Sequence, residues 1–186
     1  RTSPTPRPYI NAIQTALGPG TSMAKRRQAA RKALDVSRSF GWQDHRRAFA
    51  HYAMGRILTQ TDPEEALRQF QAADQFYSRQ VGTELHRAYL AAQLASHAVG
   101  QGNGTRALSL ANPAIHVAKR HENAALLSTL MLLRAEALEL TGRSSEAQLV
   151  RLDSLGWARY GFGSEWAVRA KMREIATLSP RRGQNG

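Results

Sequence analysis

The side chains that could do chemistry are scattered along this sequence and match no catalytic arrangement. The histidines include no pair at the i, i+4 spacing beside an acid that a helical metal site needs: His45, His51, His86, His97, His116 and His121. There is no cysteine, which excludes disulfides, thiolate nucleophiles and zinc–thiolate sites. Neither a Gly-x-Ser-x-Gly motif nor a phosphate-binding loop occurs. We therefore expect no enzyme activity, no catalytic residues, no metal and no cofactor.

Two pairs of carboxylates could support acid–base chemistry if a cleft held them. Glu64 and Glu65 directly follow Asp62-Pro63, and capping of a helix start explains all three acids. Glu136 and Glu139 lie near Arg134 and Arg143, and we interpret them as part of a solvated helix face.

Positive charge is concentrated at the two ends of the chain. The sequence holds 26 Lys and Arg against 14 Asp and Glu, a net charge of +12. Residues 1–50 hold 10 basic and 2 acidic side chains, and residues 151–186 hold 7 and 3. The basic patch on the first long helix comprises Lys25, Arg26, Arg27, Arg31, Lys32 and Arg38. It is either an edge that binds anions or a solvated face of a terminal helix.

Apolar residues recur at spacings of three and four, which predicts an all-α fold. The expected helices cover 9–17, 21–38, 44–58, 63–79, 84–100, 105–121, 123–140, 144–160 and 164–178. The second should bury Met23, Ala30, Ala33, Leu34 and Ser37. Asp44, Ser144 and Ser164 are expected caps. Pro113 should kink or break its helix, since it cannot donate to the Ser109 carbonyl.

These helices predict a single domain over 9–179, between a disordered tether at 1–8 and a disordered tail at 180–186. No run of residues is apolar enough for a membrane span. The first residue is Arg1, so we expect a chain that was processed after a signal peptide or excised from a longer protein. The Ala- and Arg-rich composition suggests a bacterial source, and the periplasm and the cytoplasm both stay open.

The sequence also repeats. Ala66, Ala107 and Ala147 lie 41 and 40 residues apart, each a few residues into the second helix of an expected pair. A small residue is needed where two helices cross closely, because a branched side chain would separate them. A helix–turn–helix unit at this period indicates an α-solenoid.

The segment DPEEALRQFQAA resembles the second helix of a tetratricopeptide repeat (TPR), with Ala66, Phe70 and Ala73 at its small–aromatic–small positions. Met54-Gly55 is similar to the large–small pair of that family's first helix. The likeness is good over 44–80; later, Ala111 replaces the aromatic residue and Ser154 the second small one. The resemblance implies hairpins stacked in a right-handed superhelix, whose concave groove is lined by first helices.

A TPR-like fold implies an adaptor or scaffold that binds another protein in this groove. The groove residues expected from the first helices are Phe49, Tyr52, Arg56, Tyr89, Gln93 and Ser96. The alternative is a basic helical protein that binds nucleic acid or an anionic envelope surface through its ends.

Four aromatic residues lie in a glycine-rich corner near the C-terminus: Trp157, Tyr160, Phe162 and Trp166. We expect them to join a last, capping helix to the open end of the solenoid, which a terminal repeat must cover. If exposed, they could instead stack on sugars or bases.

Overall fold

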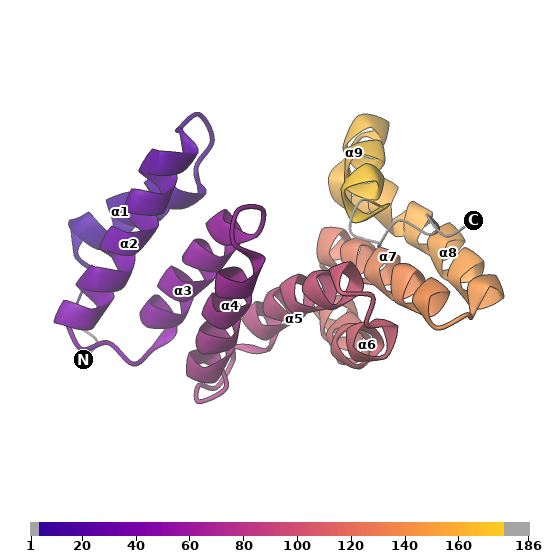
Figure 1. Ribbon diagram of the computed structural model, residues 1–186, viewed down its shortest axis with the longest axis horizontal. Coiled ribbons are helices and arrows are strands. Elements are labelled where there is room, and N and C mark those ends of the chain that lie inside the picture. Colours follow the sequence, from indigo (N-terminus) through magenta and orange to yellow (C-terminus); the bar gives the residue numbers. More distant parts are fainter. Residues whose placement is uncertain (1–3, 177–186) are drawn as a thin grey trace. The chain divides into compact units, whose positions relative to one another are not determined.

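A computed structural model describes residues 4–176, except for the side chains of residues 158, 159, 162, 165, 168 and 176. Over this span the chain forms nine helices and no strand, which confirms the all-α prediction (Figure 1). The helices are α1 (Arg7–Leu17), α2 (Met23–Ser39), α3 (His45–Leu58), α4 (Pro63–Tyr77), α5 (Glu84–Gly100), α6 (Gly104–Arg120), α7 (Ala124–Leu140), α8 (Ser144–Phe162) and α9 (Glu165–Ala176).

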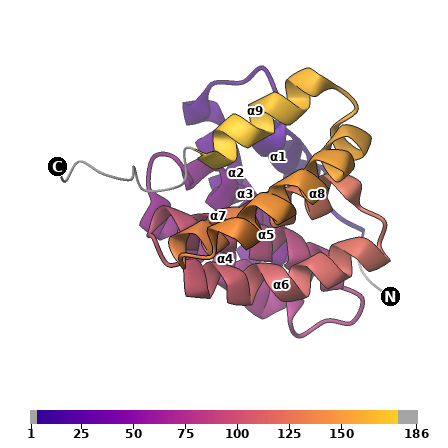
Figure 2. The same ribbon diagram turned by 90° about the vertical axis from the view of Figure 1, so that its right-hand side faces the viewer.

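The helices divide between two compact units, which are described separately. The N-terminal unit ends at Thr83 and contains α1–α4, and the C-terminal unit contains α5–α9. The expected pairs α3–α4, α5–α6 and α7–α8 each pack together, as does α1 with α2 (Figures 1 and 2). The single domain over 9–179 and the right-handed superhelix stay predictions.

Side-chain caps begin α3 and α4 of the N-terminal unit where the sequence predicted. The Asp44 carboxylate accepts a hydrogen bond from the backbone amide of Arg46 at 3.0 Å, which begins α3. The Asp62 carboxylate accepts from the amide of Glu65 at 3.1 Å, and Pro63 occupies the first position of α4. These groups satisfy amides that a helix start leaves without an internal partner.

The chain is ordered earlier than expected, because α1 begins at Arg7 rather than after residue 8. The Tyr9 ring is buried edge-on against Trp42, with ring centroids 5.2 Å apart. Its hydroxyl donates to the backbone carbonyl of Arg46 in α3. Burial raises the pKa of Tyr9, so this hydroxyl keeps its proton. The last two residues of the expected tether, Arg7 and Pro8, are therefore part of α1, while residues 1–3 lie outside the described residues.

The prediction of which α2 residues are buried is confirmed except at the first residue of the helix. Ala30, Ala33, Leu34 and Ser37 are buried, but Met23 is exposed. Met23 is the first residue of the helix, and its sulfur lies beside the Arg26 guanidinium instead of in the core.

Helices of the C-terminal unit begin at a regular interval that the sequence analysis did not predict. Its first four helices begin at Glu84, Gly104, Ala124 and Ser144, 20 residues apart. The turns before the last three contain left-handed backbone at Gly102 (φ 71°), Glu122 (φ 51°) and Gly142 (φ 78°). The next amide in each turn donates back to the preceding helix: Asn103 to Ala98, Asn123 to Ala118, and Arg143 to Leu138. One turn geometry is thus used three times.

Two helix signals in this unit do not act as expected. Of the kink or break predicted at Pro113, the break is wrong, because α6 continues through this residue. Pro113 and Ser109 are both exposed, so water can satisfy the carbonyl that the proline leaves unbonded. Ser144 does not cap α8, because it is already the first helical residue and its hydroxyl donates to Glu139 Oε2 at 2.9 Å.

The start of α9 is as predicted, since the Ser164 hydroxyl accepts from the amide of Ala167 at 3.2 Å. The predicted end at residue 178 and the disordered tail at 180–186 lie outside the described residues.

The repeated small residues lie at helix–helix contacts. Ala66 is 3% exposed, and Ala107 and Ala147 are fully buried, as predicted. In the first pair, a Cβ added to Gly55 would lie 2.6 Å from a carbon of the Phe70 ring, so α3 and α4 approach closely only because residue 55 is glycine.

Replacing Ala66 with leucine should destabilise the protein by about 1–3 kcal/mol, because the added side chain cannot fit between α3 and α4. Urea unfolding would measure this loss. The matched control is Ala24→Leu on the exposed side of α2, which should change stability by less than about 0.5 kcal/mol. Equal stability of the two variants would contradict the packing described for Ala66.

Glu122 occupies a left-handed position that Gly102 and Gly142 fill in the equivalent turns. Replacing Glu122 with glycine should therefore stabilise the protein by about 0.5–1 kcal/mol, since side chains disfavour this backbone conformation. Thermal and urea unfolding would measure the gain. Glu122→Ala removes the same carboxylate without relieving the backbone, so a gain in that variant as well would assign the effect to charge instead.

Candidate partner-binding site

Three of the predicted groove residues form a continuous row on α3, which we call the Tyr52 surface: Phe49, Tyr52 and Arg56. The Phe49 and Tyr52 rings are nearly parallel, with centroids 6.0 Å apart and planes at 14°. Arg56 Nη1 donates to the Tyr52 hydroxyl at 3.1 Å, and the guanidinium carbon lies 5.9 Å from the Tyr52 ring centroid. Phe49 and Tyr52 are half-buried and Arg56 is exposed. The row can therefore contact a partner.

The Tyr52 surface rests on the close packing between α3 and α4. The Tyr52 ring contacts the buried Phe70 ring, with centroids 6.0 Å apart, and Phe70 in turn fills the space over Gly55. A residue of the repeat pattern therefore holds the central residue of the surface in place.

The other three predicted groove residues lie on α5, in the C-terminal unit. The Tyr89 hydroxyl accepts from Asn123 Nδ2 at 2.7 Å, and Gln93 is half-buried. Ser96 donates its hydroxyl to the Ala92 carbonyl at 2.9 Å, so it is satisfied within its own helix. The two sets belong to different units, and a groove shared by both stays a prediction.

A polar chain that runs from a buried histidine to a half-buried glutamate lies beside the Tyr52 surface in the N-terminal unit. His51 Nδ1 lies 2.8 Å from Gln69 Oε1, and Gln69 Nε2 donates to Glu65 Oε1 at 2.7 Å. Because the Gln69 nitrogen donates to Glu65, its oxygen accepts from His51, and Nδ1 carries a proton. His51 also stacks on Phe76, with centroids 5.7 Å apart.

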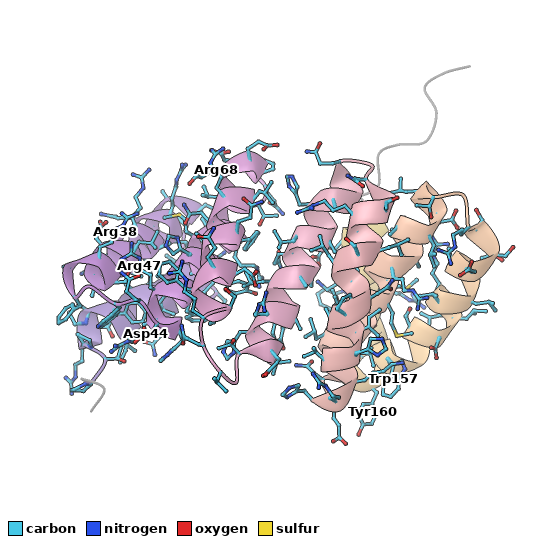
Figure 3. All side chains as sticks on the ribbon, turned by 90° about the horizontal axis from the view of Figure 1, so that it is seen from below. Arg38, Asp44, Arg47, Arg68, Trp157 and Tyr160 are labelled. Carbon is cyan, nitrogen blue, oxygen red and sulfur yellow. The ribbon has the colours of Figure 1, made fainter. Side chains whose placement is uncertain are left out.

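Burial lowers the pKa of His51 below its ordinary value, and the nearby positive charges of Arg47 and Arg38 lower it further, against the opposing effect of the Gln69 hydrogen bond. Arg47 has a buried Nε without a hydrogen-bond partner, and its guanidinium lies 5.5 Å from the Phe76 ring centroid. Figure 3 labels Arg38 and Arg47 on neighbouring helices of this unit. The sequence analysis did not predict that Arg38 and Arg47 lie near His51, because this proximity depends on the packing of α2 against α3.

The predicted basic patch is only partly exposed. Lys25, Arg27, Arg31, Lys32 and Arg38 are exposed on α2. Arg26 is half-buried, and its Nε donates to the Ala16 carbonyl at 2.9 Å, which fastens α2 to the end of α1.

An open cleft of about 780 Å³ lies between α1 and α2. Three residues of the basic patch line it from α2, namely Lys25, Arg31 and Lys32, and Arg7 lines it from α1. The sequence analysis missed Arg7 because it assigned residues 1–8 to a tether. Pro8 in the first turn of α1 was the available signal, since proline is favoured at a helix start.

The C-terminal aromatic residues do not seal the unit as expected. Tyr160 is 82% and Trp166 is 75% exposed, and Trp157 is also exposed (Figure 3). Gly161 lets α8 approach the start of α7 closely, since an added Cβ would lie 2.5 Å from the Ala125 backbone nitrogen. Ile175 is the residue of α9 that is buried in the core of this unit. The side chain of Phe162 lies outside the described residues.

The expected solvated face at Glu136 and Glu139 is also wrong. Arg151 of α8 donates to Glu136 Oε1 at 3.0 Å and to Glu139 Oε1 at 2.9 Å. The two glutamate side chains are only 17% and 13% exposed. Arg151 stands four residues after Ala147, where Phe70 stands four residues after Ala66. An ion pair thus occupies the repeat position that an aromatic ring fills in the first pair.

The buried His51 should make stability depend on pH. Its pKa in the fold lies below its value of about 6.5 in the unfolded chain. The unfolded chain therefore binds more protons as pH falls below about 6.5, and the free energy of unfolding should decrease. Urea unfolding at pH 7 and at about pH 5.5 would measure the decrease. It should be smaller in His51→Gln than in the parent. The exposed His45→Gln control should behave like the parent, and an unchanged decrease in His51→Gln would contradict the assignment.

Among the described residues, no group of three or more histidines and acids could hold a metal ion. None of the described helices is long and apolar enough to cross a membrane. No protein-family model matches the chain, and no curated protein matches it.

Proposed function

We propose that this chain is a non-catalytic adaptor or scaffold of the TPR-like α-solenoid kind, which binds a segment of a partner protein on the Tyr52 surface. The observation that carries the proposal is the ordered row of Phe49, Tyr52 and Arg56 on one helix face. Tyrosine and arginine are the residues in which protein interfaces concentrate their binding energy.

The geometry of this row favours binding in two ways. Tyr52 is held between Phe49 and Phe70 before any partner arrives, so little side-chain freedom is lost on binding. Arg56 makes one hydrogen bond through Nη1, and a guanidinium has five donors, so several remain for a carboxylate or carbonyl of the partner.

The repeated construction of the chain supports the same proposal. Helical pairs with buried alanines at a period of about 40 residues are typical of solenoids, which present extended surfaces to partners. The expected second part of the site is Tyr89, Gln93 and Ser96 on α5.

Tyr52→Ala should weaken partner binding by about 2 kcal/mol, or roughly 30-fold, because it removes the central residue of the row. Short peptides selected from a displayed random library against the full chain would serve as probes, with affinity measured by fluorescence anisotropy. The control is Tyr160→Ala, which removes an exposed tyrosine from α8.

The same titrations separate the adaptor from the anion-binding alternative. Binding to the Tyr52 surface should persist at high salt, since aromatic contacts are not screened. It should also survive combined loss of Lys25, Arg26, Arg27 and Arg31. If every selected peptide depends on those cations and on low salt, and none depends on Tyr52, the adaptor proposal is wrong.

A further inference from the structure

The cleft between α1 and α2 combines positive charge with concavity. Arg7, Lys25, Arg31 and Lys32 line it, and none of them forms an ion pair with a described residue. Its single acid, Asp35, is paired with Arg38 at 3.4 Å. A concave surface lined by one sign of charge focuses its field, so the cleft attracts anionic groups.

The surface between these cations is apolar and small. Pro8 and Ala12 of α1 face Ala29 and Val36 of α2 across the cleft. Such a surface fits aliphatic side chains, which bury apolar area against it.

The uncharged polar lining suits a peptide backbone. Asn11, Thr15 and Gln28 offer amide and hydroxyl groups that can both donate and accept hydrogen bonds. No aromatic ring lines the cleft, so nucleic-acid bases have nothing on which to stack. A protein segment therefore matches the lining better than a single-stranded nucleic acid does.

The length of the cleft fits a short segment. Its lining on α2 extends from Lys25 to Val36, which spans roughly 16 Å along a helix. An extended peptide covers that length with about five residues. Lys25 and Lys32 are two helical turns apart, about 10 Å, so two acids within such a segment can reach both.

We propose that the α1–α2 cleft is a binding site for a short acidic segment of a partner protein, in which carboxylates alternate with aliphatic side chains. The carboxylates contact Arg7, Lys25, Arg31 and Lys32, and the aliphatic groups lie on the surface formed by Pro8, Ala12, Ala29 and Val36. This site is separate from the Tyr52 surface, so either proposal can fail without the other.

The test uses the full chain carrying Tyr52→Ala, so that the Tyr52 surface does not dominate selection. Short random peptides displayed on phage are selected against this protein at about 0.15 M salt, where weak surface charge effects are partly screened. We expect the recovered sequences to contain at least two acids together with aliphatic residues. Synthetic, fluorescein-labelled copies are then titrated by anisotropy.

Two variants locate the bound peptide. Lys25→Gln combined with Lys32→Gln should weaken binding by about tenfold, since each exposed pair contributes modestly. Gln28→Trp leaves all four cations in place but fills the cleft, and it should abolish binding. The matched control, Arg27→Gln combined with Arg79→Gln, removes two exposed charges outside the cleft and should change affinity less than about twofold. Circular dichroism and thermal melting should match the parent for every variant.

Several results would overturn the proposal. Recovered peptides without acids, or acidic peptides that bind Gln28→Trp normally, would show that the cleft is not the site. Tighter binding of oligothymidine or of phosphatidylglycerol vesicles than of any selected peptide, lost in Lys25→Gln with Lys32→Gln, would assign the cleft to nucleic acid or to a membrane surface.

Discussion

The close approach of the two helices in each hairpin is the constraint on which this structure depends. Ala66, Ala107 and Ala147 are buried where second helices pack on first helices. With larger side chains at these places the helices would separate, and neither Phe70 nor Arg151 could reach its partner across the pair. The position of Tyr52 follows from the same contact, because the Phe70 ring that supports it lies over Gly55. Packing at a small residue thus determines the position of the Tyr52 surface.

Local signals allowed much of the fold to be predicted from the sequence. Caps such as Asp44 and Asp62 act on amides two or three residues away, so their effect is visible in a short window. The small residues at a 40-residue period were also visible, since they reflect one repeated contact. The predicted superhelix is not of this kind, because it depends on how successive hairpins pack.

The features that could not be predicted depend on contacts between helices. Nothing around Glu136 and Glu139 in the sequence indicates that Arg151, on the next helix, covers them. Similarly, Arg7 lines the cleft because α1 begins at residue 7 and packs on α2, and no local pattern shows that contact. The prediction for the aromatic corner was wrong for a related reason: α8 approaches α7 through Gly161, α9 buries Ile175, and Tyr160 and Trp166 stay at the surface. In the candidate site, helical spacing predicted the row of Phe49, Tyr52 and Arg56 on α3. The polar chain from His51 to Glu65 could not be predicted, because it joins residues of two helices.

The ion pairs of Arg151 have a consequence for how the nascent chain selects its helix partners. Hairpins of similar length and pattern can exchange helices during folding, and α4 and α8 carry small residues at the same spacing, Ala66 and Ala73 in α4 and Ala147 and Ser154 in α8. If α4 packed on α7, Phe70 would cover Glu136 and Glu139 and leave two carboxylates without water or a cation. If α8 packed on α3, Arg151 would meet Gly55 and lose both acids. Each mispairing leaves a charge without its counterpart. The exchange of the Phe70 ring for the Arg151 guanidinium at one repeat position therefore makes α4 specific for α3 and α8 specific for α7.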